Sequence, residues 1–99
     1  MTFERIDIEQ SIALIDEEQA VIIDIRDHVS YQSGHIDNAI HIHNENVHTF
    51  IENADKTLPL IVCCYHGNIS QGAADFFGKQ GFEKSYSLDG GYTEWAKRR

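Results

Sequence analysis

The sequence predicts an α/β fold, in which a central, mainly parallel β-sheet carries helices on both faces. Two observations support this prediction: short apolar runs rich in β-branched residues recur along the chain, and segments with apolar residues at helical spacing separate them. Strands that alternate with helices are typical of a parallel sheet covered on both sides. The 99 residues, 41% of them hydrophobic, have room for one compact domain over residues 1–99 and for no second domain.

The first quarter of the chain predicts two strands with a helix between them. Residues 6–8 are a brief edge strand, and residues 8–15 carry isoleucines at helical spacing. The acidic residues 16–18 are interpreted as a solvated connection. Residues 20–24 are almost continuously apolar, which indicates a buried, central strand.

The next segments predict two helices around a further strand. A short helical turn covers residues 28–33, and a strand covers residues 39–42. A helix marked by apolar residues at 47, 50 and 51 follows, with Asn44 or Asn46 as its candidate N-cap.

The C-terminal half predicts a strand, a helix, a strand and a short last helix. The strands cover residues 60–63 and 85–88, and the helix between them covers about residues 70–80. Gly81 is its natural C-terminal stop. A terminal helix opens at residues 92–95.

The net charge of −8 and the pI of about 5.0 argue against binding to nucleic acid or to an anionic membrane, because both need a basic face. No apolar run approaches the roughly 20 residues that span a bilayer, and the first five residues lack the order of a secretory signal. Adjacent Cys63 and Cys64 favour free thiols over a disulfide framework. We therefore expect a cytoplasmic protein.

Cys64 follows the predicted strand 60–63 and precedes a predicted helix, at the place where α/β sheets bind ligands. Backbone N–H groups of such a loop, together with the helix dipole, bind anions and favour a thiolate. Gly67 lets the loop turn without a Cβ in the way. Cys64 is therefore a candidate nucleophile, and packing as a small hydrophobe is the alternative.

The other residues near the loop allow less specific predictions. His66 either donates to a bound anion or is simply exposed, and Tyr65 is equally open. Cys63 should point to the opposite face of the sheet and belong to the core.

Three histidines lie close together in the sequence, but no carboxylate or thiolate completes a ligand set at recognisable spacing. They are His41, His43 and His48. We expect no metal and no cofactor.

Three separated segments of the chain carry a resemblance to a known family. They are residues 21–27 followed by 34–36, the loop of Cys64, Tyr65, His66, Gly67 and Asn68, and residues 88–95. With these, residues 3–97 resemble the rhodanese family, specifically its short single-domain thiosulfate sulfurtransferases encoded with bacterial glycerol 3-phosphate genes. The resemblance implies a rhodanese-like single domain and a sulfur-binding loop that extends to Ile69.

Membership of that family implies that Cys64 attacks the outer sulfur of thiosulfate, releases sulfite and carries the sulfur as a persulfide. Cyanide or a small thiol or dithiol, with thioredoxin among the candidates, then accepts the sulfur. Asp24 and Arg26 are family motif residues, either as a buried ion pair or in substrate handling.

One departure concerns the end of the loop. Many rhodaneses have arginine, threonine or serine where this chain has Ile69. Anion binding then depends on backbone N–H groups and the helix dipole. The next residue, Ser70, offers a hydroxyl group to the site or only caps the helix.

Two other functions are alternatives. A phosphatase or arsenate reductase of related fold needs an arginine six positions after its cysteine, and Ser70 stands there. A protein-specific persulfide relay would use the same Cys64 with one dedicated acceptor.

Overall fold

A computed structural model of the protein describes residues 2–98, which form a fully parallel five-stranded sheet with strand order β1-β5-β4-β2-β3. The predicted α/β architecture is therefore confirmed. The strand over residues 21–24, predicted to be central, lies between two others, whereas the strand over residues 60–63 occupies the middle of the sheet. The strands are β1 (Glu4–Ile6), β2 (Val21–Asp24), β3 (Ile40–His41), β4 (Leu60–Cys63) and β5 (Ser85–Leu88).

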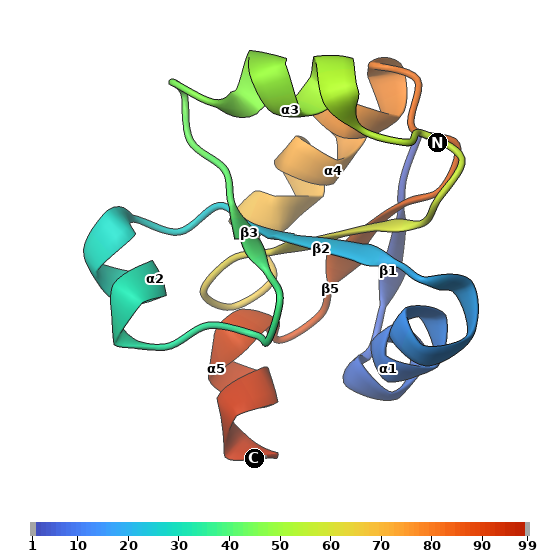
Figure 1. The fold of residues 1–99 in the computed structure, drawn as a ribbon. Coiled ribbons are helices and arrows are strands. Elements are labelled where there is room, and N and C mark those ends of the chain that lie inside the picture. Colours follow the sequence, from blue (N-terminus) through green and yellow to red (C-terminus); the bar gives the residue numbers. More distant parts are fainter. Residues whose placement is uncertain (1, 99) are drawn as a thin grey trace.

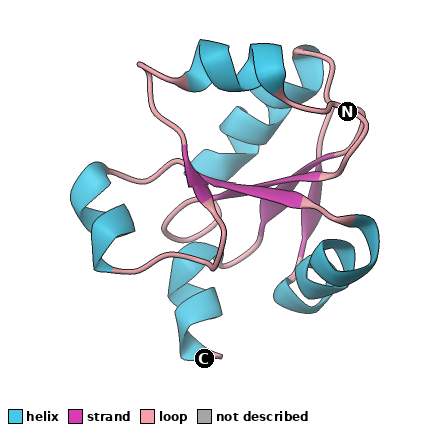
Figure 2. Cartoon of the chain, in the orientation of Figure 1, coloured by secondary structure: helices cyan, strands magenta, loops and turns pink. Residues whose placement is uncertain are grey.

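Helices cover both faces of this sheet, as Figures 1 and 2 show. They are α1 (Ile8–Glu18), α2 (His28–Ser33), α3 (Val47–Asn53), α4 (Ile69–Lys79) and α5 (Gly91–Lys97). In Figure 1, α3 and α4 lie above the sheet, α1 and α5 lie below it, and α2 lies beside β3. No helix within residues 2–98 is long and apolar enough to cross a membrane.

Alternation along the inner strands divides the core into two layers. Ile22 packs in the layer that contains Trp95 of α5, whereas its neighbour Ile23 packs in the layer that contains Phe77 of α4. Successive residues of a strand point to opposite faces, so each inner strand supplies both layers. The same alternation places Cys63 in the layer of α1 and α5.

Most predicted boundaries agree with the structure to within two residues, and the N-terminal ones need correction. The edge strand ends at Ile6 because Asp7 caps α1: its carboxylate accepts from the Gln10 N–H, and the Gln10 side chain accepts from the Asp7 N–H. The acidic residues 16–18, expected as a connection, are the last turn of α1. Gln19 ends that helix in the left-handed conformation, with φ 57°.

The predicted cap of α3 also has a different role. Asn46 does occupy the N-cap position, but its side chain makes no capping hydrogen bond. Its oxygen accepts from the His43 N–H at 2.8 Å, and its amide group donates to the His41 carbonyl at 2.8 Å. Asn46 therefore fixes the turn that leaves β3.

Candidate active site

Cys64 follows the central strand β4 directly and lies five residues before the start of α4. Its side chain is 1% exposed. Figure 1 shows the loop after β4 passing between the first turns of α4 and α5. This is the carboxyl end of a parallel sheet, where the sequence placed the nucleophile.

Several hydrogen-bond donors surround the Cys64 sulfur. The backbone N–H groups of Gly67 and Ser70 donate to Sγ over 3.2 and 3.3 Å, and the His66 N–H donates as well. The Ser70 hydroxyl oxygen lies 3.2 Å from the same sulfur. The loop and the first turn of α4 thus form a small cradle for a negatively charged atom.

The cradle changes the acidity of the thiol. Burial alone would raise the pKa of Cys64, but the hydrogen bonds of the Ser70 hydroxyl and of the N–H groups of Ser70, Gly67 and His66 outweigh it. The pKa of Cys64 therefore lies below its ordinary value, in the direction expected from the loop. A larger thiolate fraction makes this sulfur a nucleophile near neutral pH.

Gly67 has the conformation that the loop needs. Its φ is +92°, and a Cβ at this position would meet the Leu88 carbonyl oxygen and the Gly90 nitrogen, each at 2.9 Å. Both atoms belong to the backbone and cannot swing away. A side chain at position 67 would therefore displace the N–H group that contacts the sulfur.

The start of α5 holds the other side of the loop. The Tyr92 N–H donates to the Cys64 carbonyl over 2.9 Å, and the Thr93 N–H donates to the Tyr65 carbonyl over 3.1 Å. Gly91 makes this approach possible, because a Cβ there would lie 2.5 Å from the Cys64 oxygen. Two backbone bonds thereby fix the chain on which the sulfur is mounted.

The remaining predicted loop residues lie around the sulfur without contacting it through their side chains. Tyr65 is half-buried, and its phenol donates to the Asp27 carboxylate and accepts from the Asp27 N–H at 3.1 Å. The side chains of His66, Asn68 and Ile69 are exposed. Backbone groups of the loop therefore contact the sulfur, while its side chains form the rim.

Asp24 and Arg26 form a buried ion pair next to the loop. The Arg26 Nη2 lies 2.8 Å from the Asp24 Oδ2, and the side chains are 6% and 1% exposed, respectively. The same guanidinium donates to the Gly34 carbonyl at 2.6 Å and lies 4.3 Å from the centre of the Tyr92 ring. All these contacts are internal, so Arg26 braces the start of α5 rather than reaching toward solvent.

Two buried serines, Ser70 and Ser87, lie behind the Cys64 sulfur. Ser70 is the second residue of α4 and turns its hydroxyl toward Cys64, so it does not cap the helix, whose N-cap position is Asn68. Ser87 of β5 lies in none of the sequence motifs, yet its hydroxyl oxygen lies 2.8 Å from that of Ser70. A serine at an inward position of a buried strand, where apolar residues are usual, was the available signal.

Cys63 has the opposite environment. Burial and the negative charge of Asp24 raise its pKa to about 12, against a smaller opposing effect of Arg26. Its side chain is 0% exposed and belongs to the apolar layer of α1 and α5. Cys63 is therefore a neutral core thiol, as expected.

Two of the three clustered histidines, His41 and His43, are engaged in other contacts. The His41 Nε2 lies 2.7 Å from the Arg26 carbonyl, and its ring stacks on Tyr31 at 4.7 Å. His43 lies near Glu45 and is exposed. Within residues 2–98, no group of three or more His, Cys, Asp or Glu side chains is arranged to hold a metal ion.

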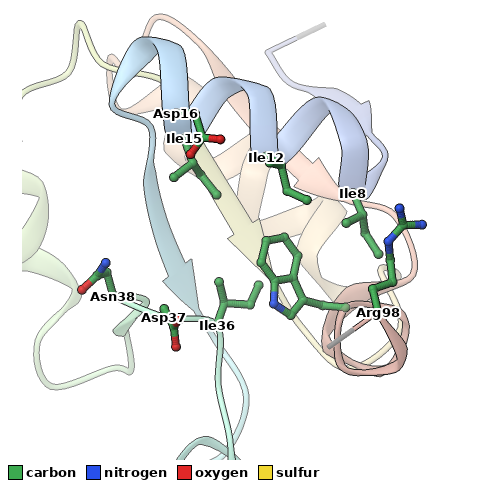
Figure 3. A pocket seen from close by; sticks show the side chains of 9 residues that line it. Ile8, Ile12, Ile15, Asp16, Ile36, Asp37, Asn38 and Arg98 are labelled. Carbon is green, nitrogen blue, oxygen red and sulfur yellow. The ribbon is translucent and has the colours of Figure 1, made fainter.

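A separate cavity of about 450 Å³ lies between α1 and α5, on the opposite side of the sheet from α4 (Figure 3). Ile8 and Ile12 of α1 line it together with Ile36 and Trp95, and Arg98 lies at its edge. None of these residues belongs to the cysteine loop. The cavity is therefore distinct from the site around Cys64.

Comparison with known proteins places this geometry in a family. The family model of the rhodanese-like domain matches residues 7–98. Thiosulfate sulfurtransferase GlpE of Pseudoalteromonas translucida is 47% identical over 96% of this chain and 90% of its own length. The protein of the same name from Pseudomonas entomophila is 50% identical over 94% of this chain and 84% of its own.

Solved structures share the fold of this chain. A rhodanese-related protein from Thermoplasma volcanium superposes with a TM-score of 0.80 at 22% identity, covering 97% of this chain and 93% of that one. BH2092 from Bacillus halodurans gives a TM-score of 0.79 at 28% identity, covering 98% and 73%. With the family model matching nearly the whole chain and a buried, donor-lined cysteine at the end of the central strand, the protein belongs to the family of rhodanese-like domains.

Proposed function

We propose that the protein is a thiosulfate sulfurtransferase in which Cys64 carries the transferred sulfur as a persulfide. The observation that carries the proposal is the cradle around Sγ: three backbone N–H groups and one hydroxyl converge on a single sulfur atom. The names of relatives at 44–50% identity support the same reaction.

The proposed first half-reaction is an attack of the Cys64 thiolate on the outer sulfur of thiosulfate. A new S–S bond forms, the S–S bond within thiosulfate breaks, and sulfite leaves with the bonding electron pair. The product is a Cys64 persulfide anion, so charge is conserved on both sides. The donors that favour the thiolate also favour this anion, because each presents a hydrogen to negative charge.

In the second half-reaction, a nucleophile bonds to the outer sulfur and removes it. The electron pair of the broken S–S bond stays on the Cys64 sulfur, which becomes a thiolate again. Cyanide would leave as thiocyanate, and a small thiol or dithiol, thioredoxin included, would take the sulfur as a persulfide. The first step converts the thiolate into the persulfide and the second step restores the thiolate, so the full cycle needs no external oxidant. We place this cycle in the cytoplasm, since reducing conditions keep Cys64 available as a thiolate.

Binding of a dianion has to occur here without a mobile cation in the loop. Residues 64–69 contain no lysine or arginine, and the nearby Arg26 guanidinium is committed to Asp24 and Gly34. Backbone N–H groups and the Ser70 hydroxyl then provide the local attraction. The exposed Ile69 side chain contributes none.

Turnover with small molecules tests the proposal. Purified protein given thiosulfate and cyanide should release sulfite and thiocyanate in equal amounts. Release of one equivalent of sulfite without thiocyanate, followed by turnover once a protein acceptor is added, would favour a dedicated persulfide relay. Failure to release sulfite from thiosulfate would contradict the proposed donor.

A further inference from the structure

Three buried groups form a continuous hydrogen-bonded chain that ends at the reactive sulfur. The Ser87 Oγ lies 2.8 Å from the Ser70 Oγ, and the Ser70 Oγ lies 3.2 Å from the Cys64 Sγ. Ser87 and Ser70 are 0% exposed and Cys64 is 1% exposed. The chain connects strand β5, helix α4 and the cysteine loop.

The number of hydrogens in this chain depends on the charge of the sulfur. With a neutral thiol, Ser87, Ser70 and Cys64 bring three hydrogens to two links, so one hydrogen has no acceptor within the chain. With a thiolate, two hydrogens serve two links and every one is used. Among residues 2–98, Ser70 is the hydrogen-bond partner of the Ser87 side chain, and no second partner offers another outlet.

Ionisation also fixes the direction of both links. A thiolate can only accept, so Ser70 must donate its single hydrogen to the sulfur. The Ser70 oxygen is then free to accept, and Ser87 is the group that donates to it. Ser87 thereby holds the Ser70 hydroxyl in the rotamer state that serves the charged sulfur.

We propose that Ser87 is a positioning residue for sulfur transfer, because its hydroxyl directs the Ser70 hydrogen at Cys64 and so favours the charged form of that sulfur. The inference rests on the proposed function of Cys64 and extends it to a residue that contacts neither the sulfur nor the substrate. The site then includes a residue of β5, in addition to Cys64 in the loop and Ser70 in α4.

The neighbouring serine of the same strand is a matched control. Ser85 lies two residues before Ser87 and is 3% exposed. Its hydroxyl donates to the Ala74 carbonyl at 2.8 Å and has no link to Cys64. Replacing Ser85 therefore removes a buried hydroxyl from the same face of the same strand and leaves the hydrogen bonds among Ser87, Ser70 and Cys64 intact.

The test is the pH dependence of Cys64 alkylation, with the modified peptide measured by mass spectrometry. Ser87→Ala should raise the alkylation midpoint by about 0.5–1 pH unit, because it removes the hydrogen bond to Ser70 and not a bond to the sulfur itself. The alkylation rate at a fixed pH below the midpoint should then fall about three- to tenfold. Ser85→Ala should keep the wild-type midpoint, even where its stability is lower.

A double variant tests whether Ser87 acts through Ser70. Ser70→Ala should raise the midpoint further than Ser87→Ala, and the combination should titrate like Ser70→Ala alone. If the alanine variant at 87 does not fold, Ser87→Cys fills the space with a weak donor and should show the same upward shift. A wild-type midpoint in a folded Ser87 variant, or full additivity in the double variant, would overturn the proposal.

Alkylation requires no thiosulfate, so the two proposals fail separately. Wild-type protein with a low midpoint that takes no sulfur from thiosulfate would contradict the proposed function. Protein that loads sulfur normally while Ser87→Ala leaves the midpoint unchanged would contradict only the role of Ser87.

Discussion

Cys63 and Cys64 are neighbours in the chain, yet the pKa of Cys63 is raised to about 12 while the pKa of Cys64 is lowered. Strand alternation separates the two thiols. Cys63 enters an apolar layer near the Asp24 carboxylate, and Cys64 turns into a ring of donors at the start of α4. One peptide bond thus separates an inert thiol from a reactive one.

The lowered pKa of Cys64 predicts how sulfur loading depends on pH. The thiolate attacks thiosulfate, so the loading rate should rise with pH through the pKa of the folded protein and then level off. Because burial is outweighed by donors, the midpoint should lie below that of an ordinary thiol. Stopped-flow measurement of sulfite release across pH gives this midpoint. A profile that still rises well above the ordinary thiol pKa would contradict the cradle.

A side chain at Gly67 should disable the loop. Gly67→Ala places a Cβ against the Leu88 carbonyl, and it puts alanine at a positive φ that disfavours any side chain. The N–H donor of residue 67 must therefore move. Loading should fall by at least about tenfold, because a hydrogen bond to an ion contributes about 1.5–3 kcal/mol.

Gly72→Ala is the control: nothing lies within 4 Å of its added Cβ in α4. That helix variant should gain about 0.5–1 kcal/mol in stability and load sulfur normally. Equal loading by both variants would refute a packed loop.

The buried pair of Asp24 and Arg26 should matter for stability far more than a surface pair of the same length. Arg26→Met leaves Asp24 charged and buried, so the free energy of unfolding should fall by about 3–5 kcal/mol. The matched control is Arg5→Met, because Arg5 and Asp89 also lie 2.8 Å apart but are 60% and 39% exposed. Its cost should stay within about 1 kcal/mol. Urea unfolding of both variants measures the difference, and similar losses would mean that burial is not what separates the pairs.

Much of this structure could be predicted from local sequence patterns. Strand β4 is a continuous apolar run, and β5 and α2 also have the predicted bounds. The position of Cys64 beyond β4 follows from these elements, since the carboxyl ends of parallel strands lie at one edge. The end of β1 was harder to predict from local patterns, because the Asp7–Gln10 capping box starts α1 where apolar residues suggest a strand.

The hydroxyl chain behind the sulfur could not be predicted in the same way. Ser70 and Ser87 are 17 positions apart and meet only because β5 pairs with β4 and α4 packs across both. Alternating polar residues in β5 suggest a half-exposed strand, whereas its serines point into the protein. Local periodicity indicates which residues face inward, but long-range docking decides which of them meet.

The proposed chemistry depends on Cys64 alone carrying the transferred sulfur. Wild-type protein should be incubated with thiosulfate, desalted and measured by intact and peptide mass spectrometry, beside Cys64→Ser and Cys63→Ser. The wild type and Cys63→Ser should gain the mass of one sulfur atom on the peptide that contains Cys64, and cyanide should remove it. Cys64→Ser should gain none. Sulfur retained by folded Cys64→Ser, or lost equally from both folded variants, would contradict the assignment of Cys64 as the sulfur carrier.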